Sequence, residues 1–358
     1  MIVKNEARVI ARCLASVRPF VSSWVVIDTG SMDGTQALVR EAMRDLPGEL
    51  HDRPWRDFAT NRNEALAFAE KRADYVLVVD ADDLLVAPEG FSLPPLTADA
   101  YELRIDYAAT SYYRTQLFRA NAGFRYVGVL HEVVVGPAGV TTARLAGLTY
   151  LISNDGSRSR DPDKYKKDAA VLEAALAEDP GHGRTAFYLA QSYRDAGEPE
   201  KALAAYERRA AMGGWAEEVW YSLYQVARLS AALERPVGDV VAAHMRAYEY
   251  RPSRAEPLCY VALYLREHGR AAAAYPFARA AADIPWPEDV LFVDTSVYGW
   301  RALDELGVSG YWAGRYAEAG GACEKLLEGT SLPPEHRARV EKNLVFCREK
   351  SGGPRGVA

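Results

Sequence analysis

The sequence predicts an α/β domain with a mixed sheet, followed by an all-α domain of helical repeats. In the first half, short β-branched runs at 24–28 and 75–80 alternate with amphipathic stretches, a pattern typical of a parallel sheet covered by helices. From about Asp161 onward strand patterns nearly vanish and Ala, Leu, Glu, Arg and Tyr dominate. That change indicates helices through the rest of the chain.

The two strand patterns of the first half each end in an aspartate, Asp28 and Asp80. Helical patterns at 35–44 and 58–72 lie between them, so we expect a doubly wound sheet. Ligands of such sheets bind at the carboxyl ends of the strands. Both aspartates are therefore expected at the binding edge.

After Asp83 strand-like segments follow one another without long helices between them. They lie at 101–107, 112–118, 125–129, 132–135 and 142–151. We expect them to form an antiparallel extension of the sheet.

The helical half contains a recurring helix–turn–helix pattern. Its clearest copy, 187–206, resembles a tetratricopeptide repeat, with small and aromatic residues at the expected offsets around Gly197. Degenerate copies lie near Gly269 and Gly314, and we expect 228–251 to hide a further unit with an altered turn. Such units bury their faces against their neighbours.

The predicted domain boundary falls in the polar run 153–162, which contains Gly and Pro. We therefore expect a first domain at 1–155, a repeat domain at 156–350 and a disordered tail at 351–358. The two prolines of 284–293 interrupt the helices, and insertions of this kind in repeat arrays often serve recognition.

Charge, cysteine usage and hydropathy exclude several classes of protein. The net charge of −6 gives no argument for nucleic-acid binding. The cysteines are scattered, which fits a reducing cytosol and argues against a disulfide framework or a zinc site. They are Cys13, Cys259, Cys323 and Cys347. With neither a secretory signal nor an apolar run long enough to span a bilayer, we expect a cytoplasmic protein.

The acidic run Asp80-Ala81-Asp82-Asp83 follows an apolar strand directly. Alternation along an extended chain places Asp80 and Asp82 on the same side. Paired carboxylates at a strand end suit Mg²⁺ or Mn²⁺ shared with a diphosphate. The alternative is a solvated acidic turn.

Three further segments are candidate ligand contacts, each with a plain structural alternative. The turn after Asp28 contains Gly30 and Gly34, which permit close backbone approach to a ligand or serve only a capped strand–helix turn. Lys4 and Asn5 either contact a nucleotide or begin a helix. Arg62 faces a phosphate near a helix N-terminus, or is an exposed helical arginine.

His131 and Glu132 lie in the apolar run 126–135. In a strand, adjacent side chains point to opposite faces, so at least one of the two is expected to face inward. A buried ionisable group needs a partner or a chemical role. Glu132 is a reasonable general base, and His131 a reasonable metal or phosphate contact. The alternative is an edge strand with one solvated face.

In combination, the segments IVKNE, VVIDTGSMDGT, FATNRNEAL, VLVVDADD and VLHE closely resemble the family 2 inverting glycosyltransferases of GT-A fold. The segment that follows, from RDPDKYKKD to EEVWYS, resembles the bacterial branch of that family with C-terminal tetratricopeptide repeats. The resemblance covers nearly the whole chain.

The resemblance implies roles for individual residues. Asp28 would accept a hydrogen bond from uracil, Asp82 would bind Mn²⁺ or Mg²⁺ with His131 beside it, and Glu132 would be the base. The implied donor-binding residues are Lys4, Asn5, Glu6, Asp28, Gly30, Ser31, Asp33, Arg62, Asn63, Asp80 and Ala81.

The resemblance also implies transfer of a sugar from a UDP-sugar to an unidentified acceptor, a peptide, protein or small-molecule hydroxyl. The repeats would either hold the acceptor or mediate self-association as a homodimer. The alternatives are a nucleotidyltransferase-like enzyme on a similar fold and a non-enzymatic nucleotide-binding repeat scaffold.

Overall fold

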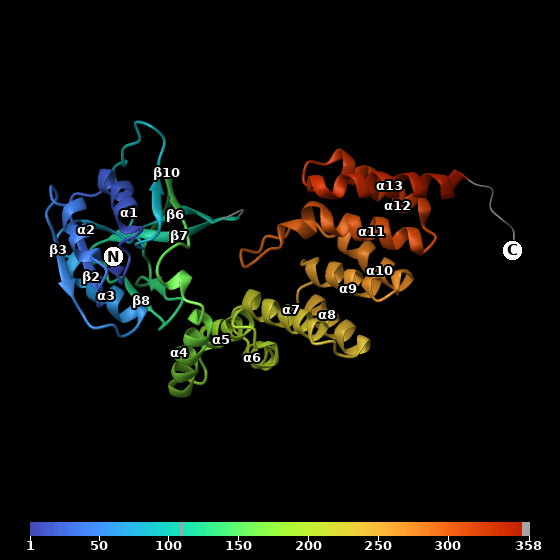
Figure 1. The fold of residues 1–358 in the computed structure, drawn as a ribbon, viewed down its shortest axis with the longest axis horizontal. Helices are drawn as coiled ribbons and strands as arrows, with labels where there is room; N and C mark the ends of the chain where they lie inside the picture. Colours follow the sequence, from blue (N-terminus) through green and yellow to red (C-terminus); the bar gives the residue numbers. More distant parts are fainter. Residues whose placement is uncertain (108–109, 353–358) are drawn as a thin grey trace. The chain divides into compact units, whose positions relative to one another are not determined.

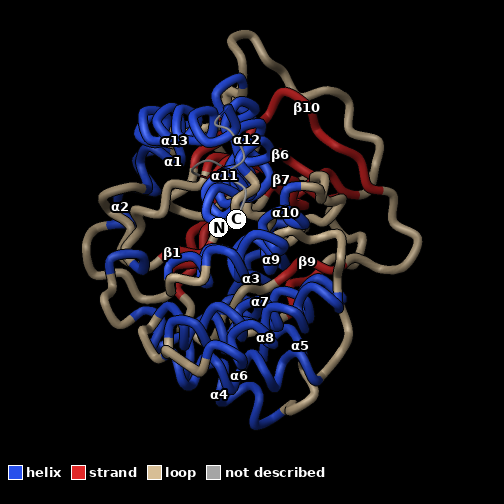
Figure 2. The backbone as a smooth tube through the Cα atoms, turned by 90° about the vertical axis from the view of Figure 1, so that its right-hand side faces the viewer, coloured by secondary structure: helices blue, strands red, loops and turns tan. Residues whose placement is uncertain are grey.

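The computed structural model describes residues 1–107 and 110–352. The chain divides into two compact units, Met1–Pro180 and Gly181–Ala358. They run from blue to green and from yellow-green to red in Figure 1. Figure 2 colours the strands red, and all the described strands belong to the first unit. The predicted order, an α/β domain and then helices, is confirmed.

A parallel sheet of three strands opens the first unit, in the order β1-β2-β3. Its strands are β1 (Ile2–Val3), β2 (Trp24–Asp28) and β3 (Gly48–Asp52), and the helices of this segment are α1 (Ile10–Val17), α2 (Thr35–Ala42), α3 (Phe58–Ala69) and the short 3-10 helix η1 (Arg18–Phe20). Strand β3 was not expected, because its sequence GELHD lacks β-branched residues. Gly48 makes the pairing possible, since a Cβ there would lie 2.2 Å from the Trp24 ring.

A second sheet has five strands in the order β4-β7-β6-β10-β5, and β8 and β9 form a separate pair. The strands are β4 (Tyr75–Leu77), β5 (Leu84–Val86), β6 (Ala100–Tyr107), β7 (Thr110–Arg119), β8 (Arg125–Val127), β9 (Val133–Val135) and β10 (Thr142–Leu151). The expected antiparallel pairing holds for β6 with β7, but β10 runs parallel to β6. The two sheets share no strand pairing, and residues of β2 and β4 line a cavity of about 410 Å³.

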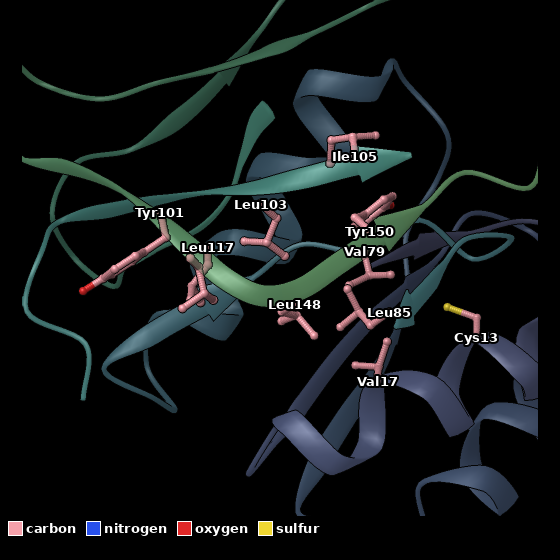
Figure 3. Packing of buried hydrophobic residues seen from close by; sticks show 11 residues of the cluster. Cys13, Val17, Val79, Leu85, Tyr101, Leu103, Ile105, Leu117, Leu148 and Tyr150 are labelled. Carbon is pink, nitrogen blue, oxygen red and sulfur yellow. The ribbon is translucent and has the colours of Figure 1, made fainter. Parts of the chain in front are cut away.

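The hydrophobic core of the first unit borders the acidic run. Leu103, Ile105 and Tyr150 are fully buried, and Cys13 of α1 packs against the same cluster (Figure 3). Burying a side chain of this size contributes roughly 2 kcal/mol. The Tyr150 hydroxyl accepts a hydrogen bond from the Asp80 backbone N–H at 2.9 Å, which ties the acidic run to this core.

The second unit consists of successive helix pairs. The helices are α5 (Gly183–Asp195), α6 (Pro199–Ala211), α7 (Ala216–Ala232), α8 (Val237–Tyr250), α9 (Glu256–Glu267), α10 (Ala271–Ala282), the π-helical turn η3 (Val297–Arg301), α11 (Ala302–Trp312), α12 (Tyr316–Glu328) and α13 (Pro334–Gly352). Residues 283–294, between α10 and the turn that leads into η3, are neither helix nor strand, as the prolines there predict. No helix among the described residues is long and apolar enough to cross a membrane.

The turns inside these pairs share one geometry. Gly197, Gly269 and Gly314 all have φ between +72° and +75°, and Glu234 takes the same place with φ +52°. Each turn is closed by the same backbone hydrogen bond across five residues: Glu198 N to Tyr193 O, Arg235 N to Ser230 O, Arg270 N to Leu265 O and Arg315 N to Gly310 O, at 2.8–3.0 Å. The predicted repeat with an altered turn is therefore confirmed in α7–α8.

The two compact units divide between Pro180 and Gly181. Helix α4 (Lys164–Glu178) goes with the first unit, because Asp168 on it pairs with Arg158 of the 3-10 helix η2 (Arg158–Arg160). The domain boundary at 155/156 stays a prediction. Of the predicted disordered tail 351–358, the first two residues end α13, and 353–358 lie outside the described residues.

The left-handed turn residues give opposite predictions for two equivalent positions. We expect Glu234→Gly to raise the free energy of unfolding by about 1 kcal/mol, because glycine adopts φ +52° without a Cβ clash. Gly269→Glu should lower it by a similar amount, at φ +72°. Urea denaturation followed by circular dichroism measures both. Shifts of the same sign would contradict the assignment of equivalent turns.

Candidate active site at the strand ends

The candidate site lies where β1, β2 and the segment after β4 end. Asp28 is the last residue of β2, and Asp80 follows β4. The Asp83 N–H donates to the Asp80 carbonyl at 3.2 Å, which closes the acidic run into a turn.

Asp28 is fully buried and only half satisfied. Its Oδ1 accepts hydrogen bonds from the backbone N–H groups of Gly30 and Ser31 at 2.8 and 2.7 Å. Its buried Oδ2 has no partner among the described residues. An unsatisfied buried acceptor costs roughly 1–3 kcal/mol, so a ligand N–H has a ready acceptor here.

Hydrogen bonds join the loop after β1 to the turn after β2, and the two segments together are called the floor of the candidate site. Asn5, with φ +57°, donates its N–H to Ser31 Oγ and accepts from the Met32 N–H through Oδ1, both at 2.9 Å. Asp33 accepts from the Ala7 N–H at 2.9 Å. The side chains of Ser31 and Asp33 therefore hold the floor in place, and their direct contact with a ligand remains a prediction. Lys4 is exposed beside it.

A segment that the sequence indicates only as a linker completes this edge. The Gly156 N–H donates to Asp82 Oδ2 at 3.1 Å, and a Cβ on Gly156 would lie 2.6 Å from that oxygen. The Ser157 N–H and hydroxyl bond to Glu6 at 3.1–3.2 Å. Nothing in the polar composition of 153–162 distinguishes Gly156 or Ser157 from ordinary linker residues, so these contacts were not predicted.

Burial and neighbouring charges change the pKa values of the three carboxylates in the acidic run. Burial, followed by the charge of Asp80, raises the pKa of Asp83 to about 7. Burial also raises the pKa of Asp82, with Asp80 adding to it. Burial opposes the ionisation of Asp80 as well, but Arg62 and then Arg114 outweigh it and hold the Asp80 pKa below its ordinary value. A cation at this edge would favour the ionised forms.

Asp82 is the candidate ligand for a cation that a bound diphosphate would share. Among the described residues no three His, Cys, Asp or Glu side chains form a metal-binding group. Mg²⁺ is nonetheless commonly held by one or two carboxylates together with substrate phosphates, and Asp82 is half-buried. His131 and Glu132 lie in the loop before β9, and His131 is exposed with φ +51°. The expectation that both belong to a strand is therefore wrong.

Arg62 lies between two carboxylates. Its Nη2 donates to Asp80 Oδ1 at 2.6 Å and its Nε to Glu132 Oε1 at 2.5 Å. The next residue, Asn63, exchanges two hydrogen bonds with the Tyr126 backbone at 2.8 and 2.9 Å. The structure thus brings Arg62, Asp80 and Glu132 together, and the exposed-arginine alternative is wrong. The role of Arg62 at a phosphate remains a prediction.

Comparison with known proteins finds relatives of the first unit. Residues 1–125 match the glycosyl transferase family 2 model. Over 146 residues the chain is 35% identical to a tetratricopeptide-repeat-containing protein of Synechococcus elongatus, covering 37% of this chain and 34% of that protein. Over 146 residues it is 27% identical to the prophage-derived glycosyltransferase SunS of Bacillus subtilis, covering 37% and 33%. The match thus spans about a third of the length of either relative.

Among solved structures, YrrB, a tetratricopeptide-repeat protein with an unusual peptide-binding site, is 16% identical. That match covers 52% of this chain and 87% of YrrB, with a TM-score of 0.40. Residues 1–125 thus match a family 2 glycosyltransferase domain, and helix pairs with tetratricopeptide-like turns follow it.

Proposed function

We propose that the chain transfers a sugar from a UDP-sugar to an acceptor hydroxyl with inversion at the anomeric carbon. The observation that carries this proposal is the unpartnered Oδ2 of Asp28, fully buried at the end of β2. Uracil presents an N–H donor to such an acceptor. Asp82, on the neighbouring acidic run, would then face the diphosphate end of the same ligand.

A divalent cation, Mn²⁺ or Mg²⁺, is part of the proposal. Asp82 would hold it together with the diphosphate, because Asp82 is half-buried, whereas Asp83 is buried and Asp80 has an arginine partner. Asp80 pairs with Arg62, and Asp83 accepts from the Ser153 N–H at 3.1 Å. When bound, the ion neutralises charge that develops on the departing UDP.

Glu132 is the proposed general base. Its side chain is 10% exposed, and Arg62 holds it through Oε1. The acceptor oxygen would attack the anomeric carbon while the bond from that carbon to the diphosphate oxygen breaks. The hydroxyl proton would pass to the Glu132 carboxylate. One displacement of this kind inverts the configuration.

For the second unit we propose that the repeats bind the acceptor, a peptide or protein. Stacked helix pairs offer extended concave surfaces for such partners. Self-association as a homodimer through the repeats is the competing proposal. Sedimentation of the full chain, with and without a peptide that accepts sugar, distinguishes the two.

Replacing Asp82 tests the metal. UDP release from a panel of UDP-glucose, UDP-galactose and UDP-N-acetylglucosamine with Mn²⁺ should fall about 100-fold or more in Asp82→Asn, because a cation contributes several kcal/mol to transition-state charge stabilisation. EDTA should abolish it in the wild type. Asp45→Asn, on an exposed aspartate that pairs with Arg18, should remain fully active. Activity that persists in EDTA would remove the metal from the proposal.

Replacing Asp28 tests the orientation of the nucleotide. In Asp28→Asn the amide oxygen can still accept from the Gly30 and Ser31 N–H groups, so the fold is kept. The amide NH₂ then replaces Oδ2, so that a donor of the protein faces the N–H donor of uracil. We expect the Kd for UDP with Mn²⁺ to rise about 10- to 100-fold by calorimetry. An unchanged Kd for UDP would mean that uracil does not bind at Asp28.

A further inference from the structure

One helix connects the acidic run to the loop that carries Glu132. Helix α3 begins at the cap Asp57, whose Oδ1 accepts from the Thr60 N–H at 2.7 Å. It lies beside β8 in Figure 1. The Phe58 N–H donates to the Val129 carbonyl at 3.3 Å. The Asn63 side chain donates to the Tyr126 carbonyl and accepts from the Tyr126 N–H. Strand β8 and the loop 128–132 that follows it are thus both hydrogen-bonded to α3.

Arg62 lies at the centre of these contacts and is nearly inaccessible. Its side chain is 11% exposed, and its guanidinium lies 5.4 Å from the centre of the Tyr126 ring. Burial disfavours the charge, but Asp80 and then Glu132 outweigh it and hold the Arg62 pKa well above its ordinary value. Arg62 is therefore a permanent cation, and its Nε and Nη2 bind two different carboxylates, those of Glu132 and Asp80.

One residue of this loop has an unfavourable backbone conformation. His131 has φ +51°, and a left-handed non-glycine residue costs about 1–2 kcal/mol. Glu132 directly follows this strained residue. Without the Arg62 bond, nothing in the local backbone preference would keep its carboxylate at the acidic run.

We propose that Arg62 is a positioning residue that acts through Glu132: it fixes the base on the acceptor side at a set place relative to Asp80 on the donor side. This inference rests on the proposed role of Glu132. A lysine could keep the charge, but its single ammonium could not reproduce two donors in the fixed geometry of the fork. Arg62 would then govern turnover more than donor affinity.

The test is a double-mutant cycle read by two measurements, UDP release from the active donor with water as acceptor and the Kd for UDP with Mn²⁺. Arg62→Lys should lower kcat about 10-fold or more, because misplaced groups lose rate steeply, while the Kd for UDP stays within about 3-fold. Glu132→Gln should lower kcat about 100-fold or more. In the Glu132→Gln background, Arg62→Lys should lower kcat by less than about 3-fold, since the two act as a unit.

The control is Arg119→Lys, in the same unit, because Arg119 also pairs with a carboxylate, Asp99, and lies 5.0 Å from the centre of an aromatic ring, Tyr75. It should leave both readouts unchanged. Multiplicative losses in the double variant, or a Kd for UDP that rises in step with the fall in kcat, would overturn the role of Arg62 alone. Full activity of Glu132→Gln, or no turnover of any donor by the wild type, would overturn the proposed function and this inference with it.

Discussion

Carboxylates gathered at one half-buried edge impose the strongest physical constraint on the first unit. Asp80, Asp82 and Asp83 follow one another at the end of the core, and Glu132 and Glu6 approach from other segments. Arg62 satisfies two of these groups, Asp80 and Glu132. Burial, with the charge of Asp80 adding to it, raises the pKa values of Asp82 and Asp83. A ligand that brings a cation would complete the balance.

The fold places these groups with parts that are distant in sequence. The hydroxyl of Tyr150 on β10 fixes the backbone of Asp80, and the Gly156 N–H then holds Asp82. On the other side, the floor formed by Asn5 and Ser31 sets the turn that satisfies one oxygen of Asp28. The open oxygen of Asp28 and the acidic run thus belong to one edge, which suits an elongated ligand with a donor at one end and charge at the other.

Much of the fold could be predicted because its signals are local. The alternation at 142–151 predicts β10 with its observed bounds, and the glycine turns predict the helix pairs. Strand β3 could not be predicted, since its residues have low strand propensity and depend on the space beside Trp24. The parallel pairing of β10 with β6 is a tertiary choice that strand patterns do not encode.

The candidate site was predictable only in part, for the same reason. Asp28 and Asp80 end strand patterns, which predicts both at the carboxyl ends of strands, although β2 and β4 belong to different sheets. The Arg62–Glu132 pair joins residues 70 positions apart, and the Asp82–Gly156 bond joins residues 74 apart. Neither has a local sequence signal. His131 and Glu132 were predicted to lie in a strand because the residues around them are apolar. The left-handed backbone of His131, which makes this segment a loop, has no signal in the sequence.

The central claim is that Asp28 and Asp82 contact opposite ends of one nucleotide. A crystal structure of the chain with UDP and Mn²⁺ tests it most directly. The account predicts uracil N–H within hydrogen-bond distance of Asp28 Oδ2, about 3 Å, and Mn²⁺ between Asp82 and the diphosphate. A nucleotide bound with its base at the acidic run, or bound away from this edge, would contradict the account.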